Sequence, residues 1–385
     1  MDRFQGNITT KLPQTSTSIF AVMSQLANEH NAVNLSQGFP DFPISGELVE
    51  LVNHFMREGY NQYAPMPGVA PLRNAISNMF EKNHGTLYNA DKEITITAGA
   101  TQAIFTAISA FISKDDEVII FEPAYDCYAP SIILNGGMVK YSQLQYPDYS
   151  INWDEFPRMI TSNTKMIIIN SPHNPTGSII SKEDMQRLEN LIKGRDIIVL
   201  SDEVYEHIIF DGATHQSAVR FPELASQSIV VGSFGKTFHA TGWKMGFVLA
   251  PENIMAEFRK VHQFVVFAVN TPIQYAIAEY LQNPDNYTSL GSFYQQKRDF
   301  FLSAISKSRF KPLTCNGTYF QLLDYSNISD EPEMDMAVRL VKEYGIATVP
   351  VSSFYRTKEN NRTLRFCFAK QESTINSAAE ILCKI

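Results

Sequence analysis

The sequence predicts an α/β fold with two parts, a large domain with a mostly parallel central sheet sandwiched by helices and a smaller α+β domain. Several short runs of Ile and Val without polar alternation predict strands that are buried on both faces. A helical stripe follows the first of these strands, and the pattern changes towards the C-terminus. A chain of 385 residues is long enough for two or three domains.

The predicted strands are short and almost unbroken in their apolar character. They cover residues 93–97, 117–121, 165–170, 196–200, 228–231 and 246–250. After the first strand, apolar residues between Ile104 and Ile112 fall on one helical face, which gives the strand–turn–helix order of a parallel sheet. We therefore assign residues 45–280 to the large domain.

The C-terminal part of the chain has a mixed pattern that predicts a smaller α+β domain over residues 281–385. Its expected elements are a helix over 334–344, strands over 346–351 and 363–368, and a last helix from residue 372. Residues 1–44 show weak helical periodicity between Ile19 and Leu26. We expect this N-terminal segment to pack against the small domain.

The composition excludes several kinds of partner. The formal net charge is −8, from 32 Lys+Arg against 40 Asp+Glu, which disfavours nucleic acid because its phosphates require a basic surface. No apolar run reaches the length of a membrane helix, and the N-terminus has no apolar signal segment. The 4 cysteines are scattered and the 8 histidines form no ligand motif, so we expect no metal and a cytoplasmic location.

Polar motifs follow four of the predicted strands, where open α/β sheets bind their ligands. They are AGATQA at 98–103, NSPHNPTG at 170–177, DEVY at 202–205 and SFGKTFHATGWKMG at 233–246. In the first motif, small residues allow backbone amides and the Thr101 hydroxyl to converge on an anion at a helix N-terminus. Each motif alone also has a structural interpretation, as a glycine turn, a polar turn, a helix N-cap or a surface loop.

Two charged residues in these motifs are candidates for chemistry. Lys236 follows a buried strand among small residues, so its amine can be desolvated, its pKa lowered and its nucleophilicity used in Schiff-base chemistry. A surface lysine is the ordinary alternative, but predicted strands lie on both sides of this loop. Lys244 adds a second positive charge, which favours the binding of an anion. Asp202 ends an apolar strand, where a carboxylate is costly to bury unless a cation or donor faces it.

Arg365 is a third charged candidate. It lies within the apolar run TLRFCF, where a single guanidinium requires an anion. A planar guanidinium can bind a carboxylate through two parallel hydrogen bonds, so a substrate carboxylate is one possible partner. A structural salt bridge is an equal alternative on these residues alone.

Taken in order, these motifs resemble the class I/II aminotransferases, which are fold type I enzymes that use pyridoxal 5′-phosphate (PLP). The resemblance covers nearly the whole chain, from LSQGFPDF at 35–42 through NQY at 61–63 to RFCFAK at 365–370, and the stretch 233–246 is its most specific part. Within the class the chain is most similar to the methionine, kynurenine and glutamine transaminases, above all to bacterial methionine aminotransferases.

The resemblance implies catalytic roles for residues around the PLP ring. Lys236 is expected to form the internal aldimine with PLP and then to act as the base at the substrate's α-carbon. Asp202 is expected to pair with the pyridinium nitrogen. Asn174 and the Tyr205 hydroxyl are expected to bind the ring O3′, and Tyr125 to stack on the ring.

The resemblance also implies a phosphate site and a dimer. The expected phosphate ligands are the Ala100 amide, Thr101, Ser233 and Lys244. Tyr63 matches a family tyrosine that reaches the phosphate from the partner subunit. We therefore expect a homodimer with shared active sites.

Substrate recognition is expected to rest on Arg365, which would bind the α-carboxylate together with Asn174 and the backbone at Gly38. The substrate side chain is expected to contact Phe20, Tyr63 and, from the partner subunit, Phe267. These residues are aromatic, and no second arginine is evident for a dicarboxylate. This favours methionine or aromatic amino acids, with glutamine or kynurenine as further possibilities.

The expected activity is transfer of an amino group from such an L-amino acid to a 2-oxo acid by a ping-pong mechanism. The alternative is a PLP-dependent C–S β-lyase acting on a cysteine conjugate or cystathionine, since the same motifs serve both reactions. A PLP-sensing regulator is disfavoured because the chain has no basic helix-turn-helix extension. Thr101 stands where some relatives have Tyr, and His173 has no assigned role.

Overall fold

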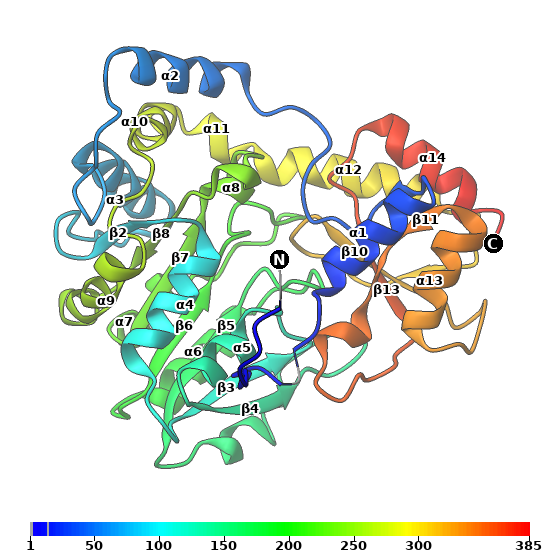
Figure 1. Ribbon diagram of the computed structural model, residues 1–385, viewed down its shortest axis with the longest axis horizontal. Helices are drawn as coiled ribbons and strands as arrows, with labels where there is room; N and C mark the ends of the chain where they lie inside the picture. The colour runs from blue at the N-terminus through cyan, green and yellow to red at the C-terminus, as the bar shows by residue number, and fades with distance from the viewer. Residues whose placement is uncertain (1–2, 14) are drawn as a thin grey trace.

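The computed structural model describes residues 3–13 and 15–385, and its centre is a seven-stranded sheet (Figure 1). The strands, in spatial order, are β2 (Ile94–Thr97), β8 (Gly246–Leu249), β7 (Ser228–Ser233), β6 (Ile198–Asp202), β5 (Thr164–Asn170), β3 (Glu117–Glu122) and β4 (Met138–Gln143). The pairs β7–β6, β6–β5, β5–β3 and β3–β4 are parallel. The prediction of a mostly parallel sheet is therefore confirmed.

Strand β8 is the exception in this sheet, because it runs antiparallel to both β2 and β7. Its residues are all buried, so its composition resembles that of its parallel neighbours and does not reveal its direction. Only the short helix α8 (Phe234–Thr237) and a 3₁₀ turn lie between β7 and β8. A short connection of this kind returns the chain antiparallel, whereas a parallel return requires a long crossover.

The sequence did not predict strand β4. It lies at the edge of the sheet, pairs only with β3, and has exposed or half-buried residues at most positions. Its sequence MVKYSQ is consequently half polar, and it lacks the continuous apolar run on which the other strands were predicted. Lys140 within it forms an ion pair with Glu117 at 3.1 Å.

Helices cover both faces of the sheet, as predicted. On one face, α4 (Ala100–Phe111), α5 (Tyr128–Leu134) and α9 (Glu252–Val265) pack against the strand residues that point towards them, such as Ile168 and Val231. On the other face, α3 (Ala70–His84), α6 (Lys182–Ile192) and α10 (Thr271–Tyr280) pack against the alternate residues, such as Ile167 and Val230. Helix α2 (Gly46–Arg57) packs against α10.

The C-terminal part has its own sheet. The strands are β12 (Val349–Pro350), β13 (Thr363–Cys367), β10 (Phe320–Asp324) and β9 (Lys311–Pro312), and the helices are α12 (Leu290–Ala304), α13 (Glu333–Tyr344) and α14 (Glu372–Leu382). All neighbouring strands in this sheet are antiparallel. The predicted helices at 334–344 and from residue 372, and the strand at 363–368, lie within one residue of their expected positions.

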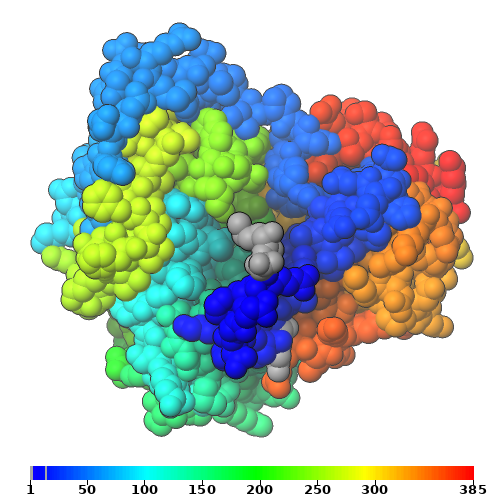
Figure 2. Space-filling view, in the orientation of Figure 1, coloured from blue at the N-terminus to red at the C-terminus, as the bar shows by residue number. Residues whose placement is uncertain are grey.

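The N-terminal segment packs against the C-terminal part. Helix α1 (Ile19–Glu29) contacts α13, and β1 (Val33–Asn34) pairs in parallel with β11 (Ile346–Ala347). Figure 2 shows residues 3–13, in dark blue, lying over the face between the two larger parts of the chain. The packing is as expected, while the domain boundaries at residues 44 and 280 stay predictions.

Short helices complete the chain. They are α7 (Pro222–Ala225), α11 (Asp285–Thr288) and the 3₁₀ turns at Phe156–Met159, Ala218–Arg220, Thr241–Trp243 and Val351–Phe354. Across the described residues, no helix is both long and apolar enough to cross a membrane.

Candidate active site

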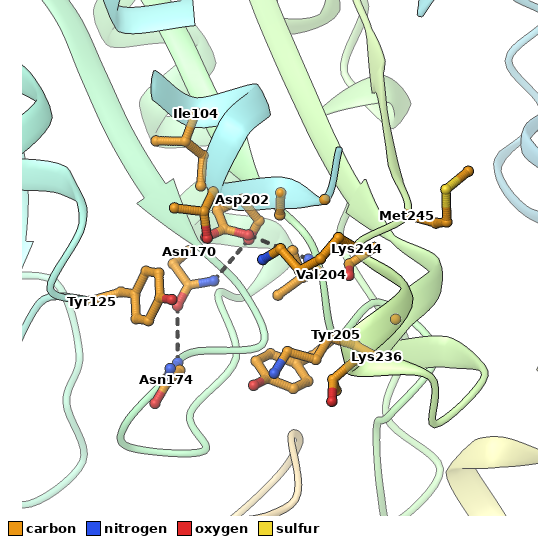
Figure 3. Close-up of a pocket in the computed structure, with 16 residues that line it drawn as sticks. Ile104, Tyr125, Asn170, Asn174, Asp202, Val204, Tyr205, Lys236, Lys244 and Met245 are labelled. Atoms are coloured by element: carbon orange, nitrogen blue, oxygen red, sulfur yellow. Dashed lines mark hydrogen bonds between the residues drawn. The ribbon is translucent and has the colours of Figure 1, made fainter. Parts of the chain in front are cut away.

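A cavity opens at the carboxyl ends of β5, β6 and β7, where α4 begins (Figure 3). The structure brings most of the predicted site residues to this cavity. Those lining it are Ala100, Thr101, Tyr125, Asn174, Asp202, Tyr205, Ser233, Lys236 and Lys244. Residues from five separate chain segments therefore meet in one place. Four of these segments are the motifs after predicted strands, and the fifth, with Tyr125, was implied by the family resemblance.

One end of the cavity is suited to an anion. Gly99 has a φ of +78°, which turns the chain from β2 into α4 and points the first amides of the helix at the cavity. A Cβ on Gly99 would lie 3.5 Å from Lys244 Nζ, so that amine is beside the turn. The helix N-terminus, Thr101, Ser233 and Lys244 together form a donor set for a phosphate.

Asp202 lines the cavity from the last position of β6. It is 3% exposed, and its Oδ2 accepts a hydrogen bond of 2.5 Å from the Tyr128 hydroxyl. Burial raises the pKa of Asp202 to about 6, and the hydrogen bond from Tyr128 opposes this rise. No ion pair joins Asp202 to a Lys or Arg among the described residues. The helix N-cap interpretation is wrong, because residues 204–207 form a turn and the next helical element begins only at Ala218.

Asn170 is a residue of the site that the sequence reasoning missed. It is the register partner of Asp202 on the neighbouring strand, and its side-chain amide donates to the Asp202 carbonyl at 2.8 Å. Its Oδ1 accepts from the Asn174 backbone amide at 2.9 Å, which fixes the loop carrying Asn174 (Figure 3). Asn170 could have been predicted from the sequence, because it is a polar residue at the end of an apolar strand, as Asp202 is.

His173 lies in the same loop and does not line this cavity. Its Nδ1 is 2.7 Å from the Thr176 hydroxyl, and burial lowers its pKa to about 4. An imidazole of this kind is uncharged at neutral pH. The contact with Thr176 stabilises the loop.

Lys236 lies on α8 at the rim of the same cavity. Its Nζ donates to the Tyr319 hydroxyl at 3.0 Å and to the Gly38 carbonyl at 3.2 Å. Burial lowers the pKa of Lys236 to about 8, and the nearby positive charges of Arg365 and Lys244 act in the same direction. The interpretation as an ordinary surface lysine is thus wrong.

Arg365 is 1% exposed and has no acidic partner within ion-pair distance among the described residues. Its Nη1 donates to Asn174 Oδ1 at 2.7 Å and its Nη2 to the Ser36 carbonyl at 3.0 Å, while Nε has no partner in the described part of the chain. The structural salt bridge that the sequence left open is therefore absent there. The guanidinium remains available for an anion.

Aromatic rings surround this guanidinium. Its Cζ lies 3.8 Å from the ring centre of Phe320, 5.1 Å from that of Phe20 and 5.5 Å from that of Phe354. Phe20 therefore lies beside Arg365, while its expected contact with the substrate side chain stays a prediction. Phe320 and Phe354 were not predicted from the sequence. A carboxylate bound here would leave an apolar, aromatic surface for the rest of the ligand.

Tyr63 and Phe267 do not line the cavity of their own chain. Their rings contact each other at 5.4 Å between centroids, and they are 84% and 52% exposed. Their expected roles required a partner subunit, so both roles stay predictions. The Gly38 carbonyl contacts Lys236 and Tyr319, while its expected contact with a substrate carboxylate also stays a prediction.

Comparison with known proteins identifies the family. The profile of aminotransferase class I and II matches residues 30–382. The chain belongs to this family. It is 47% identical over 374 residues to the methionine aminotransferase of Escherichia coli (strain K12), with 97% of each chain covered.

Other aminotransferases are also similar along the whole chain. The kynurenine–oxoglutarate transaminase of Dictyostelium discoideum is 35% identical over 415 residues, which cover 97% of this chain and 95% of the relative. A crystal structure from Escherichia coli with a methionine aminotransferase function superposes with a TM-score of 0.97 at 46% identity, covering 98% of this chain and 100% of the other. The fold is therefore fold type I, and the enzyme is a transaminase.

Enzymes of this family use PLP, and the cavity of this transaminase fits that cofactor. The turn at Gly99 and Lys244 would hold the phosphate, the buried Asp202 without a cationic partner would hold the ring nitrogen, and Lys236 has a nucleophilic amine in reach of the same space. Tyr125 and Tyr205 provide an aromatic face and a hydroxyl (Figure 3). Among the described residues, no group of three or more His, Cys, Asp or Glu side chains could hold a metal ion.

Proposed function

We propose that this aminotransferase transfers the amino group of an L-amino acid with an apolar side chain, methionine or an aromatic amino acid, to a 2-oxo acid by a ping-pong mechanism. The observation that carries the proposal is Arg365, a buried guanidinium with no acidic partner among the described residues. It lies among aromatic rings and donates a hydrogen bond to Asn174, which lines the cavity with Lys236 and Asp202. An α-carboxylate satisfies the guanidinium, and the rings suit an uncharged side chain.

The polar and charged residues of the site have separate roles in this reaction. PLP, when bound, supplies an electron-withdrawing ring that stabilises negative charge at the substrate's α-carbon. Asp202, as the carboxylate, would hold the ring nitrogen of the cofactor. Lys236 would hold the cofactor through its amine, and its Nζ would take up and return the proton of the substrate's α-carbon. Arg365 and Asn174 hold the substrate carboxylate, which fixes the α-carbon with respect to Nζ.

The relatives support this choice of substrate. The Escherichia coli relative is a methionine aminotransferase, and others act on kynurenine with oxoglutarate. Among the described residues, no arginine lines the cavity itself, and Arg365 adjoins it through Asn174, so the carboxylate of an aspartate side chain would have no arginine of its own there. Neither the family nor these relatives favour the C–S β-lyase alternative.

The proposal includes a cytoplasmic homodimer with shared active sites. The exposed rings of Tyr63 and Phe267 support the dimer, because large exposed apolar groups side by side commonly mark an interface. The four cysteines are free, which is in keeping with a reducing compartment.

The cofactor assignment is tested at Lys236. Purified enzyme should show a visible absorption band, and borohydride should fix PLP to Lys236. Lys236→Ala should lose this covalent fixation. Lys297→Ala is a matched control, because burial also lowers the pKa of Lys297 but its Nζ donates to the Lys370 carbonyl away from the cavity. Equal loss of fixation in both variants would contradict the assignment.

The substrate assignment is tested with the same wild-type enzyme and a set of amino donors. With a common 2-oxo acid acceptor, kcat/KM should be higher for methionine and phenylalanine than for aspartate by roughly a hundredfold, the scale of leaving a buried charge unpaired. Faster turnover of aspartate would overturn the proposal. Release of pyruvate and ammonia from cystathionine without any acceptor would favour the lyase instead.

A further inference from the structure

Two hydrogen-bond acceptors hold the amine of Lys236. Its Nζ donates to the Tyr319 hydroxyl at 3.0 Å and to the Gly38 carbonyl at 3.2 Å. The Tyr319 hydroxyl in turn donates to the same Gly38 carbonyl at 2.6 Å. A hydroxyl has a single hydrogen, so the oxygen of Tyr319 faces Lys236 as an acceptor. No further hydrogen-bond partner of Nζ occurs among the residues that the structure describes.

This arrangement constrains the orientation of the amine. An uncharged amine nitrogen has four tetrahedral directions, taken by Cε, two hydrogens and the lone pair. The two acceptor oxygens are 2.6 Å apart and lie on the same side of Nζ, so the amine turns its hydrogens towards this pair and its lone pair away from it. Because burial lowers the pKa of Lys236 to about 8, a useful fraction of the amine is uncharged near neutral pH.

Tyr319 is itself firmly held. It is fully buried, and its ring packs edge-on against Tyr205 at 5.2 Å between centroids. The preceding Thr318 has a φ of +67°, a conformation that a β-branched residue rarely adopts and that costs on the order of 1–3 kcal/mol. Hydrogen bonds from Thr318 N to the Ile208 carbonyl and from Phe368 N to the Tyr319 carbonyl, both 3.0 Å, maintain it.

We propose that Tyr319, together with the Gly38 carbonyl, is a positioning residue that orients the free amine of Lys236 for proton transfer at the substrate's α-carbon. The inference rests on the proposed function. In this step the Nζ lone pair forms a new N–H bond with the α-proton, the C–H bond breaks, and its electron pair stays with the substrate. Tyr319 keeps its own proton, since burial holds its pKa well above the ordinary value.

The test is Tyr319→Phe in the holoenzyme, a change that removes the acceptor and keeps the ring. We expect the rate of α-proton transfer, measured by stopped-flow absorbance in a single half-reaction, to fall roughly ten- to a hundredfold, as for a misplaced catalytic group. The isotope effect with α-deuterated substrate should rise. KM, the PLP dissociation constant and the melting temperature should stay close to wild type, and a crystal structure should show Nζ moved from the Gly38 carbonyl.

Tyr294→Phe is the matched control. The Tyr294 ring lies 5.6 Å from that of Tyr319, and its buried hydroxyl has no hydrogen-bond partner in the described part of the chain. This variant should retain the wild-type proton-transfer rate and isotope effect.

Several outcomes would overturn the proposal. They are a wild-type rate in Tyr319→Phe, an equal loss in the control, or a parallel fall in PLP affinity and melting temperature, which would indicate a structural role. Failure of the proposed function would look different, because the wild-type enzyme would then lack covalent fixation of PLP at Lys236.

Discussion

At the scale of single residues, the protonation state of Asp202 depends on one tyrosine. Burial favours the neutral acid and raises its pKa to about 6, while the Tyr128 hydroxyl stabilises the carboxylate. A carboxylate is needed to pair with a protonated ring nitrogen. Tyr128 therefore helps to keep Asp202 in its active form at neutral pH, although it does not line the cavity.

Tyr128→Phe should raise the pKa of Asp202 further, because the variant loses a hydrogen bond to the charged form. Such bonds contribute about 1.5 kcal/mol, which corresponds to roughly one pH unit. Asp202 is ionised above its pKa, so PLP affinity should fall as pH decreases through about 6 in the wild type and at higher pH in the variant. Fluorescence titration of PLP binding across pH measures both transitions.

The comparison of the two pH profiles removes contributions that both proteins share, such as titration of the PLP phosphate. Asp202→Asn should lack the transition that the tyrosine shifts. Superimposable profiles for wild type and Tyr128→Phe would show that the hydrogen bond does not stabilise the carboxylate.

At the scale of elements, burial determined what could be predicted from the sequence. Strands β5, β6 and β7 are covered on both faces, so their apolar runs were visible, whereas the edge strand β4 is half polar and was missed. The antiparallel direction of β8 was hidden because burial does not depend on strand direction. The antiparallel direction of β8 results from the short connection between β7 and β8.

In the candidate site, residues that follow strands were predictable from the sequence, and residues brought there by tertiary packing were not. Lys236, Asp202 and Asn174 follow strands directly, so their proximity follows from the sheet. Tyr128 and Tyr319 contact Asp202 and Lys236 across 74 and 83 residues of sequence, and nothing in their local patterns distinguishes them from other core tyrosines. Such contacts follow from tertiary packing.

The turn that leads into α3 gives a test of local conformation. Gly68 has a φ of +100°, and a Cβ there would overlap the Ile96 side chain on β2. Gly59 has a similar φ of +90° but open space around it. Gly59→Ala should lose about 1 kcal/mol of unfolding free energy from the backbone penalty alone, and Gly68→Ala about 2–4 kcal/mol because overpacking adds to it.

Urea unfolding of the two variants measures this difference. Their midpoints should both lie below that of the wild type, with Gly68→Ala the lower. Equal midpoints would mean that Ile96 moves aside without cost and that only the backbone conformation requires glycine at position 68.

At the scale of the whole molecule, Tyr63 and Phe267 were expected in the site but do not line the cavity of their own chain. Tyr63 is 84% exposed and Phe264 is 86% exposed, and the Tyr63 ring contacts Phe267. The segments that carry these rings are joined by a hydrogen bond of 2.6 Å from the Thr271 hydroxyl to the Gln62 carbonyl. They therefore form one surface, which supports the proposal that a second copy covers it.

Shared sites predict that two inactive variants restore activity when they are combined. Lys236→Ala removes the amine from its own site, and Tyr63→Ala removes the side chain that would reach the partner's site. A hybrid dimer of the two then has one complete site, with Lys236 from one subunit and Tyr63 from the other.

Co-expression with two different tags and tandem purification gives the hybrid, whose turnover should clearly exceed that of either parent. The control pairs Lys236→Ala with Arg365→Ala. Lys236 lines the cavity and Arg365 donates to Asn174 of the same cavity in the same chain, so each site of that hybrid lacks one essential group. Equal inactivity of both hybrids, with dimers present by sedimentation, would show that each chain forms its site alone.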